Sequence, residues 1–72
     1  MNNAERIRIA MVKRGNIKEA ELARKLNIFP QSLNTRLKKN NFKEEELVKI
    51  AEALDCTYIS TFKLNDTGEV IS

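Results

Sequence analysis

The chain has 72 residues, of which 42% are hydrophobic and 32% charged, and its formal net charge is +3. This length fits one small domain, and without a membrane-length apolar run or a recognisable secretory leader we expect a cytoplasmic protein. Cys56 is the single cysteine and the chain has no histidine, so neither an internal disulfide nor a metal site is expected.

A first helix is predicted from about Asn3 to Arg14, and Gly15 is expected to end it. Three apolar residues share its inward face: Ile7, Ala10 and Met11. Further along, Asn16 and Glu19 have the spacing of a capping box, with Asn in place of the usual Ser or Thr. This pattern predicts that a second helix begins near residue 17.

The segment from Lys18 to Lys39 predicts two short amphipathic helices joined by a tight turn. Leu22, Ala23 and Leu26 form an apolar stripe of helical period, and Asn27 is expected to end that helix in a left-handed conformation. Ile28 is expected to return to the core. Pro30 suits the first position of the next helix, because the N–H group that proline lacks is not needed there.

This next helix is predicted to run from about Pro30 to Lys39. Leu33 and Leu37 hold it to the core by their i, i+4 spacing. Its opposite face carries amide, hydroxyl and cationic groups: Gln31, Ser32, Thr35 and Lys38 or Lys39. Such groups can bind base edges and phosphates.

A fourth helix is predicted from about Glu44 to Leu54, after a polar break at Asn40 and Asn41. Phe42 and Leu47 have the spacing of a hydrophobic staple if Lys43 is the N-cap. The inward face carries four apolar residues: Leu47, Ile50, Ala51 and Leu54. The three glutamates that open this helix are most simply explained by the helix dipole.

The last part of the chain has a strand composition. Residues Thr57 to Leu64 are rich in β-branched and aromatic side chains, and Asn65 to Gly68 fit a type I turn that closes on a left-handed glycine. Val70 and Ile71 would form the return strand. An isolated hairpin is marginal in water, so it needs a partner. That partner is either its own helices or, as we favour, the same hairpin of a second subunit.

Charge is unevenly distributed along the chain. Residues 13–43 carry nine cations against two carboxylates, whereas residues 44–72 carry two cations against seven carboxylates. The cationic half contains the paired short helices. A charged run is usually a solvated face, but this coincidence favours a phosphate-binding surface.

The sequence resembles the phage-repressor type of helix-turn-helix protein, the lambda-repressor-like or Cro-like (XRE) superfamily. The phrases ELARKLNI, QSLNTRLKKNNF and EEELVKIAEALDC occur in the order and spacing of that family. The resemblance implies a mainly α fold, a lambda-repressor-like bundle of about four short helices with a C-terminal β-hairpin. Residues 1–56 would form the helix-turn-helix domain, and residues 57–72 a hairpin that serves as its dimerisation element.

The resemblance also implies which residues read bases. They are the first residues of the third helix and one a turn later: Pro30, Gln31, Ser32 and Thr35. Gln31 is the strongest candidate, because its amide can bind adenine N6 and N7 together. Pro30 replaces the glutamine common at its position. Phe29 replaces a small polar cap, and it is either buried in the turn or in contact with a thymine methyl group.

Phosphate contacts are implied near the start of the second helix and the end of the third. The matching residues are Lys18, Glu19, Arg36, Lys38, Lys39 and Asn40. Glu19 replaces a glutamine, and its charge would repel phosphate unless it is engaged as a helix cap. Dimer contacts are expected from the hairpin: Tyr58, Ile59, Phe62, Leu64, Val70 and Ile71. Cys56 is expected to be a small apolar filler.

The function implied is a sequence-specific, double-stranded-DNA-binding transcriptional regulator, a homodimeric repressor of phage or mobile-element type. No catalytic constellation is visible, so we expect no enzyme activity, no cofactor and no small-molecule ligand. The alternative is a protein-interaction module, an anti-repressor or antitoxin-like protein with weak or no DNA binding. Its basis is the set of departures at Glu19, Phe29 and Pro30 and the acidic C-terminal half.

Overall fold

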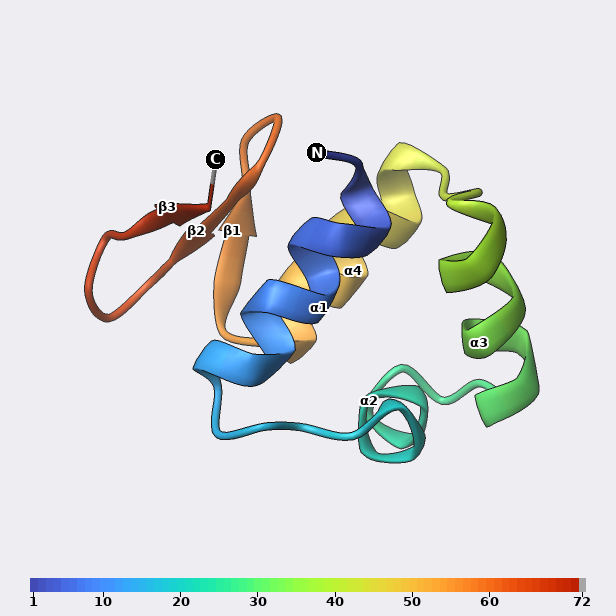
Figure 1. The fold of residues 1–72 in the computed structure, drawn as a ribbon. Coiled ribbons are helices and arrows are strands. Elements are labelled where there is room, and N and C mark those ends of the chain that lie inside the picture. The colour runs from blue at the N-terminus through green and yellow to red at the C-terminus, as the bar shows by residue number, and fades with distance from the viewer. Residues whose placement is uncertain (72) are drawn as a thin grey trace.

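The computed structural model describes residues 1–71, which form four helices followed by a three-stranded antiparallel sheet (Figure 1). The helices are α1 (Asn3–Lys13), α2 (Glu19–Lys25), α3 (Pro30–Lys39) and α4 (Glu44–Ala53). The strands are β1 (Cys56–Tyr58), β2 (Phe62–Leu64) and β3 (Val70–Ile71), paired in chain order. The predicted mainly helical bundle with C-terminal β-structure is confirmed. Over residues 1–71, the helices are too short and too polar for any to cross a membrane.

The core lies between the helices and the inner face of the sheet. Helices α1 and α4 occupy the middle of the molecule, the sheet covers one side of them, and α3 lies at the far side (Figure 1). Every helix and every strand contributes buried apolar side chains. The largest that are fully buried are Ile7, Leu22, Leu33, Leu54 and Phe62. The core therefore extends across both the helical part and the sheet.

Helix α1 ends as predicted, but the chain after it does not form the predicted capping box. Gly15 has φ +89° and Asn16 has φ +58°, both in the left-handed region. Helix α2 then begins at Glu19 with Lys18 as its N-cap, and no side chain caps it. The prediction for Asn16 is wrong because asparagine has two uses at such a junction. Here its tolerance of left-handed backbone is used, and not its capping oxygen.

Helix α4 begins as predicted. Lys43 is its N-cap residue, and the Glu46 carboxylate accepts a hydrogen bond from the Lys43 backbone N–H at 2.9 Å. Phe42 packs against the buried core, as a staple residue should. Three glutamates in the first turn lie at the positive end of the helix dipole.

An arginine clamp closes the other end of α4. Arg14 donates from Nε to the Leu54 carbonyl and from Nη2 to the Asp55 carbonyl, each at 2.8 Å. Its guanidinium also forms a two-bond ion pair with Asp66 in the β2–β3 loop, at 2.9 and 3.0 Å. One side chain thus ties the end of α1 to the end of α4 and to the sheet.

The C-terminal segment is a three-stranded meander and not the predicted two-stranded hairpin. The single strand predicted from Thr57 to Leu64 is interrupted by a turn, so that Tyr58 pairs with Phe62. Ser60 has φ +144° inside this turn. The chain reverses between β2 and β3 where a turn was predicted, and Gly68 has the predicted left-handed conformation at φ +76°. Side-chain composition favoured extended backbone throughout this segment, but it carries no signal for where the chain reverses.

The inner face of the sheet packs on the helices of its own subunit. Phe62, Leu64 and Ile71 are buried, so these three residues are not surface-exposed as the predicted dimer contacts would be. Ile59 and Val70 are 55% and 49% exposed, and Tyr58 is half-buried. The partner that the hairpin was expected to need is therefore supplied by its own helices. Cys56 is buried at the start of β1, consistent with a small apolar filler.

Candidate nucleic-acid interface

Helices α2 and α3 are joined by a turn that fixes their relative orientation. Asn27 has φ +59°, as predicted. The N–H of Ile28 bonds to the Ala23 carbonyl at 3.0 Å, and that of Asn27 bonds to the Arg24 carbonyl at 3.1 Å. These two bonds form a Schellman motif, in which the free carbonyls at the end of a helix are satisfied. Ile28 packs against the core directly after it, which confirms the prediction for this residue.

Helix α3 presents a polar face. Pro30 is its first residue, as predicted, while Leu33 and Leu37 are buried on the opposite side. Gln31 and Thr35 are exposed, and Ser32 is half-buried. A shallow depression between α2 and α3 is lined by five residues: Glu19, Pro30, Gln31, Asn34 and Thr35. Three of the four predicted base-reading residues therefore share one surface, and Ser32 lies outside the lining of that depression.

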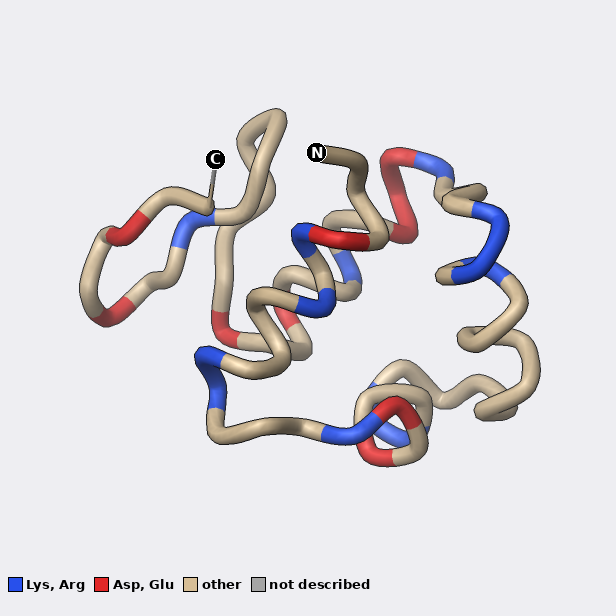
Figure 2. The backbone as a smooth tube through the Cα atoms, in the orientation of Figure 1, with Lys and Arg blue, Asp and Glu red and all other residues tan. Residues whose placement is uncertain are grey.

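Free cations lie at the ends of the helix pair. Lys18 precedes α2, and Lys38 and Lys39 are exposed in the last turn of α3, where Figure 2 also shows a concentration of positive charge. Within the described part of the chain, six cations of the segment 13–43 form no salt bridge: Lys18, Arg24, Lys25, Lys38, Lys39 and Lys43. These are the groups that remain available for a polyanion.

Two predicted phosphate contacts are engaged inside the protein. Arg36 of α3 forms an ion pair with Glu46 of α4. Asn40 has a left-handed conformation at the end of α3, and its side-chain oxygen accepts a hydrogen bond from the Ala4 N–H at 3.0 Å. Both residues hold α3 against the remaining helices. Their side chains therefore position the helix that carries the polar face.

Glu19 lies at the centre of a three-helix contact. Its Oε1 accepts a hydrogen bond from Asn34 of α3 at 3.0 Å, and its Oε2 pairs with Arg8 of α1 at 3.0 Å. The Asn34 hydrogen bond, followed by the Arg8 ion pair, holds the pKa of the Glu19 carboxyl below its usual value. The carboxylate is thus ionised and engaged at both oxygens. Glu19 was expected to be engaged as a helix cap, and it is engaged instead by side chains of α3 and α1.

Phe29 is the N-cap residue of α3, and 80% of its surface is exposed. The interpretation of Phe29 as a buried turn residue is therefore wrong. Its backbone carbonyl accepts bonds from the N–H groups of Ser32 and Leu33, but its side chain makes no capping bond. The chain turns into α3 without using the ring for packing.

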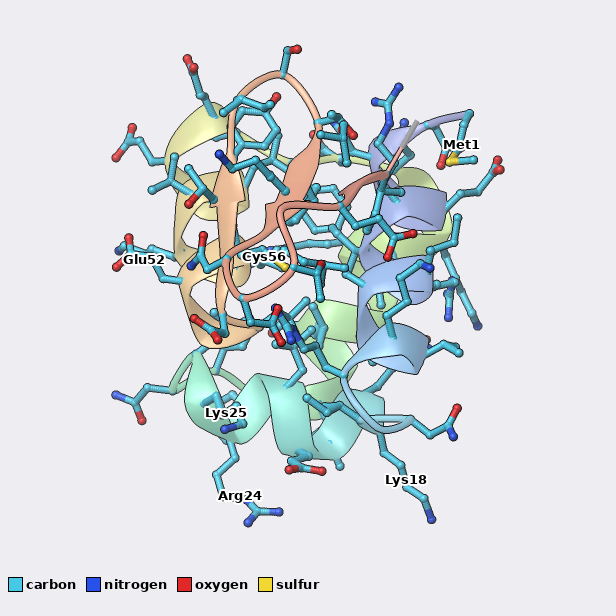
Figure 3. The ribbon with its side chains drawn as sticks, turned by 90° about the vertical axis from the view of Figure 1, so that its left-hand side faces the viewer. Met1, Lys18, Arg24, Lys25, Glu52 and Cys56 are labelled. Carbon is cyan, nitrogen blue, oxygen red and sulfur yellow. The ribbon has the colours of Figure 1, made fainter. Side chains whose placement is uncertain are left out.

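Sequence reasoning missed two groups of residues. Arg24 and Lys25 were not assigned a role, although both are exposed in the last turn of α2. Figure 3 shows Arg24 projecting outward at the opposite end of α2 from Lys18. Their place beside the turn was a usable signal. Arg8, Arg14 and Asn34 were not identified as tertiary ties. These ties join residues 11 to 52 positions apart, so local spacing carried no signal for them.

Comparison with known families explains this arrangement. Residues 5–58 match the model of the bacteriophage CI repressor helix-turn-helix domain. The chain belongs to this family. The match spans α1 to β1 and confirms the phage-repressor resemblance; β2 and β3 lie beyond it. A search of curated proteins and a search of solved structures each gave no significant match. Membership assigns the chain to a class of DNA-binding regulators that are not enzymes.

Proposed function

We propose that the protein is a sequence-specific repressor that binds double-stranded DNA as a homodimer, of the kind found in phages and mobile elements. The observation that carries this proposal is the polar face of α3, with Gln31 and Thr35 exposed between unpaired lysines at both ends of the helix pair. Helix-turn-helix proteins use such a face to read the major groove while flanking cations bind phosphates.

Base reading is assigned to the first turns of α3. Gln31 is exposed. Its side-chain amide can donate a hydrogen bond to adenine N7 and accept one from the adenine N6 amino group. Thr35 lies one turn further along the same exposed face. Pro30 shapes the start of the helix and offers no donor. Ser32 is half-buried, so its hydroxyl contributes only if a base edge comes close enough to form a hydrogen bond with it.

Phosphate binding is assigned to the free lysines. Lys18 would bind the backbone at the start of α2, and Lys38 and Lys39 at the end of α3. Arg36 and Asn40 support the same contact indirectly, because they fix α3 against α4 and α1. Glu19 sits near this surface, and its pairing with Arg8 offsets its repulsion of phosphate.

The dimer is proposed to form through an edge of the sheet. Strands β1 and β3 are its edge strands, and unpaired edge backbone groups can pair with another chain. Ile59, Val70 and the half-buried Tyr58 would supply the apolar contacts. A two-fold dimer would place its α3 helices roughly 34 Å apart and so read a near-palindromic site.

A salt titration tests DNA binding. A preferred duplex is first selected from a random pool, and its Kd for the full chain is then measured from about 50 to 200 mM salt. Each neutralised phosphate contributes roughly −0.9 to the log–log slope, so we expect affinity to fall at least about a hundredfold. An affinity that does not change with salt would contradict the proposal.

The second candidate function is a protein-interaction module that has kept the fold. It is favoured by the internal engagement of Glu19, Arg36 and Asn40, three of the six predicted phosphate contacts. This candidate predicts weak or no duplex binding even at low salt. The titration therefore separates the two functions in one experiment.

A further inference from the structure

The ring of Phe29 has no structural role in the subunit. It is the most exposed of the large hydrophobic side chains over residues 1–71, and it stands at the N-cap of α3. Ser, Thr, Asp or Asn at this position would cap the helix, whereas the Phe29 side chain makes no capping bond. Neither packing nor capping engages the ring within the described residues, so the ring is open to a contact outside the subunit.

The surroundings of Phe29 favour DNA as that contact. The residue directly precedes Pro30 and Gln31, so its ring lies at the end of α3 that the proposed function points toward bases. It lines a shallow depression together with five neighbours: Ala20, Arg24, Asn27, Ile28 and Pro30. Arg24 forms no salt bridge within the described residues, and it projects outward from the last turn of α2 (Figure 3). The ring and Arg24 lie side by side, and on DNA a thymine methyl group and a backbone phosphate would be their respective partners.

We propose that Phe29 is a specificity-determining residue that packs its ring against the 5-methyl group of a thymine in the major groove. This inference rests on the proposed function. The thymine methyl is the apolar feature of the major groove, and cytosine offers a polar amino group and no methyl there. Burial of one methyl-sized group changes Kd roughly fourfold, which corresponds to about 0.8 kcal/mol. The ring thus recognises one thymine by an apolar contact, without a hydrogen bond to that base.

Replacement of thymine by deoxyuridine tests the contact directly, since it removes the methyl group and leaves the hydrogen-bonding edge intact. Each thymine of the preferred duplex is replaced in turn, and Kd is measured for the full chain and for Phe29→Ala. We expect one thymine in each half-site at which deoxyuridine weakens the unmodified protein roughly fourfold. At that same position Phe29→Ala should bind thymine and deoxyuridine equally.

Three control variants separate this contact from other effects. Phe29→Ser removes the ring but supplies a good N-cap, so it should keep its thermal stability and still lose the discrimination. Val12→Ala removes an exposed apolar residue of α1 that belongs to neither the proposed DNA surface nor the proposed dimer surface, and Thr35→Ala removes the other candidate for a methyl contact. Both should keep the fourfold effect at the Phe29 thymine.

The possible results are distinct. Discrimination that persists in Phe29→Ala, or that is absent at every thymine in the unmodified protein, overturns the inference. So does a change in sedimentation of Phe29→Ala without a change in discrimination, because the ring would then contact another copy of the chain. Failure of the unmodified protein to bind any duplex at low salt would instead defeat the proposed function, and the inference with it.

Discussion

The two ends of this molecule use the same kinds of charged residue in different ways. At the sheet end, Arg14 is locked to Asp66 and to two carbonyl groups, and Lys13 pairs with Glu69. At the α2–α3 end, Lys18, Arg24, Lys25, Lys38 and Lys39 form no salt bridge within residues 1–71. Lys13 and Arg14 thus hold the sheet end together, whereas at the α2–α3 end these five cations remain open to a partner beside the structural pairs of Glu19 and Arg36.

This difference shows why counting charges along a sequence overstates a binding surface. Residues 13–43 contain nine cations, but Lys13, Arg14 and Arg36 are used in internal ion pairs. The cations that remain lie around the helix-turn-helix. The charge pattern therefore indicated the half of the chain that contains the helix-turn-helix, and the tertiary contacts separate the cations in ion pairs from those that remain open to a partner.

The largest effect is expected from the sheet end. Phe62→Ala should lower the free energy of unfolding by about 3–5 kcal/mol, because it empties a fully buried site in the core. Urea denaturation measures this loss, and Val12→Ala, at an exposed site, should stay within about 0.5 kcal/mol of the unmodified protein. A loss below about 1 kcal/mol for Phe62→Ala would show that the sheet does not belong to the core.

The sequence predicted the helical half of the fold better than the sheet. Hydrophobic periodicity located all four helices, and Asn27 and Pro30 marked the turn between α2 and α3 correctly. The break at Ser60 was missed, since a β-branched run contains no Gly, Pro or Asn signal for a turn. Phe62, Leu64 and Ile71 were therefore read as a dimer surface, although they complete the core of their own subunit.

The next effect concerns base reading at the α2–α3 end. Gln31→Ala should weaken binding to the preferred duplex by about 1–3 kcal/mol and relax the choice at one base pair, through loss of a bidentate contact. Binding to the selected duplex and to variants at each position measures this. Equal losses on preferred and scrambled duplexes would mean that Gln31 only positions the protein, and the readers would then be sought at Ser32 and Thr35.

A smaller effect is expected from a single phosphate contact. Lys38→Gln should weaken all duplexes by a similar factor and reduce the salt slope by roughly 0.9, without a change in stability. Lys63→Gln is the matched control, since Lys63 is an exposed lysine on β2 at the opposite end. If both variants changed the slope equally, the free cations of the α2–α3 end would have no special role in binding.

The candidate site was predictable to the extent that it is local. Gln31, Thr35, Lys18, Lys38 and Lys39 were assigned from the family resemblance and from their positions on the predicted helices, and all five are exposed. Contacts between distant segments were not predictable in this way. Arg36 and Asn40 were expected to contact phosphate, but they bind residues of α4 and α1 instead. Periodicity within one helix cannot reveal such partners.

The smallest effect is the pH dependence of the unfolding free energy that comes from one carboxylate at each end, Glu19 and Asp66. Asn34 and Arg8 lower the pKa of Glu19, and Arg14 lowers the pKa of Asp66 through its hydrogen bond. Each folded pKa lies below its unfolded value, so each group stabilises the protein above about pH 4 to 5. That contribution is lost as pH falls through the folded pKa. Urea denaturation from pH 7 to 3 should therefore show unfolding free energies that fall less steeply in Glu19→Gln and Asp66→Asn.

The same two variants should differ in DNA binding at neutral pH. Glu19→Gln removes a negative charge beside the candidate phosphate contacts and keeps an oxygen that can accept from Asn34, so we expect tighter binding to all duplexes. Asp66→Asn removes a charge at the sheet end, and its DNA affinity should stay unchanged. Kd measurements at constant salt make the comparison. Equal shifts in both variants would mean that net charge alone governs binding, and that the division between a structural end and a binding end is incorrect.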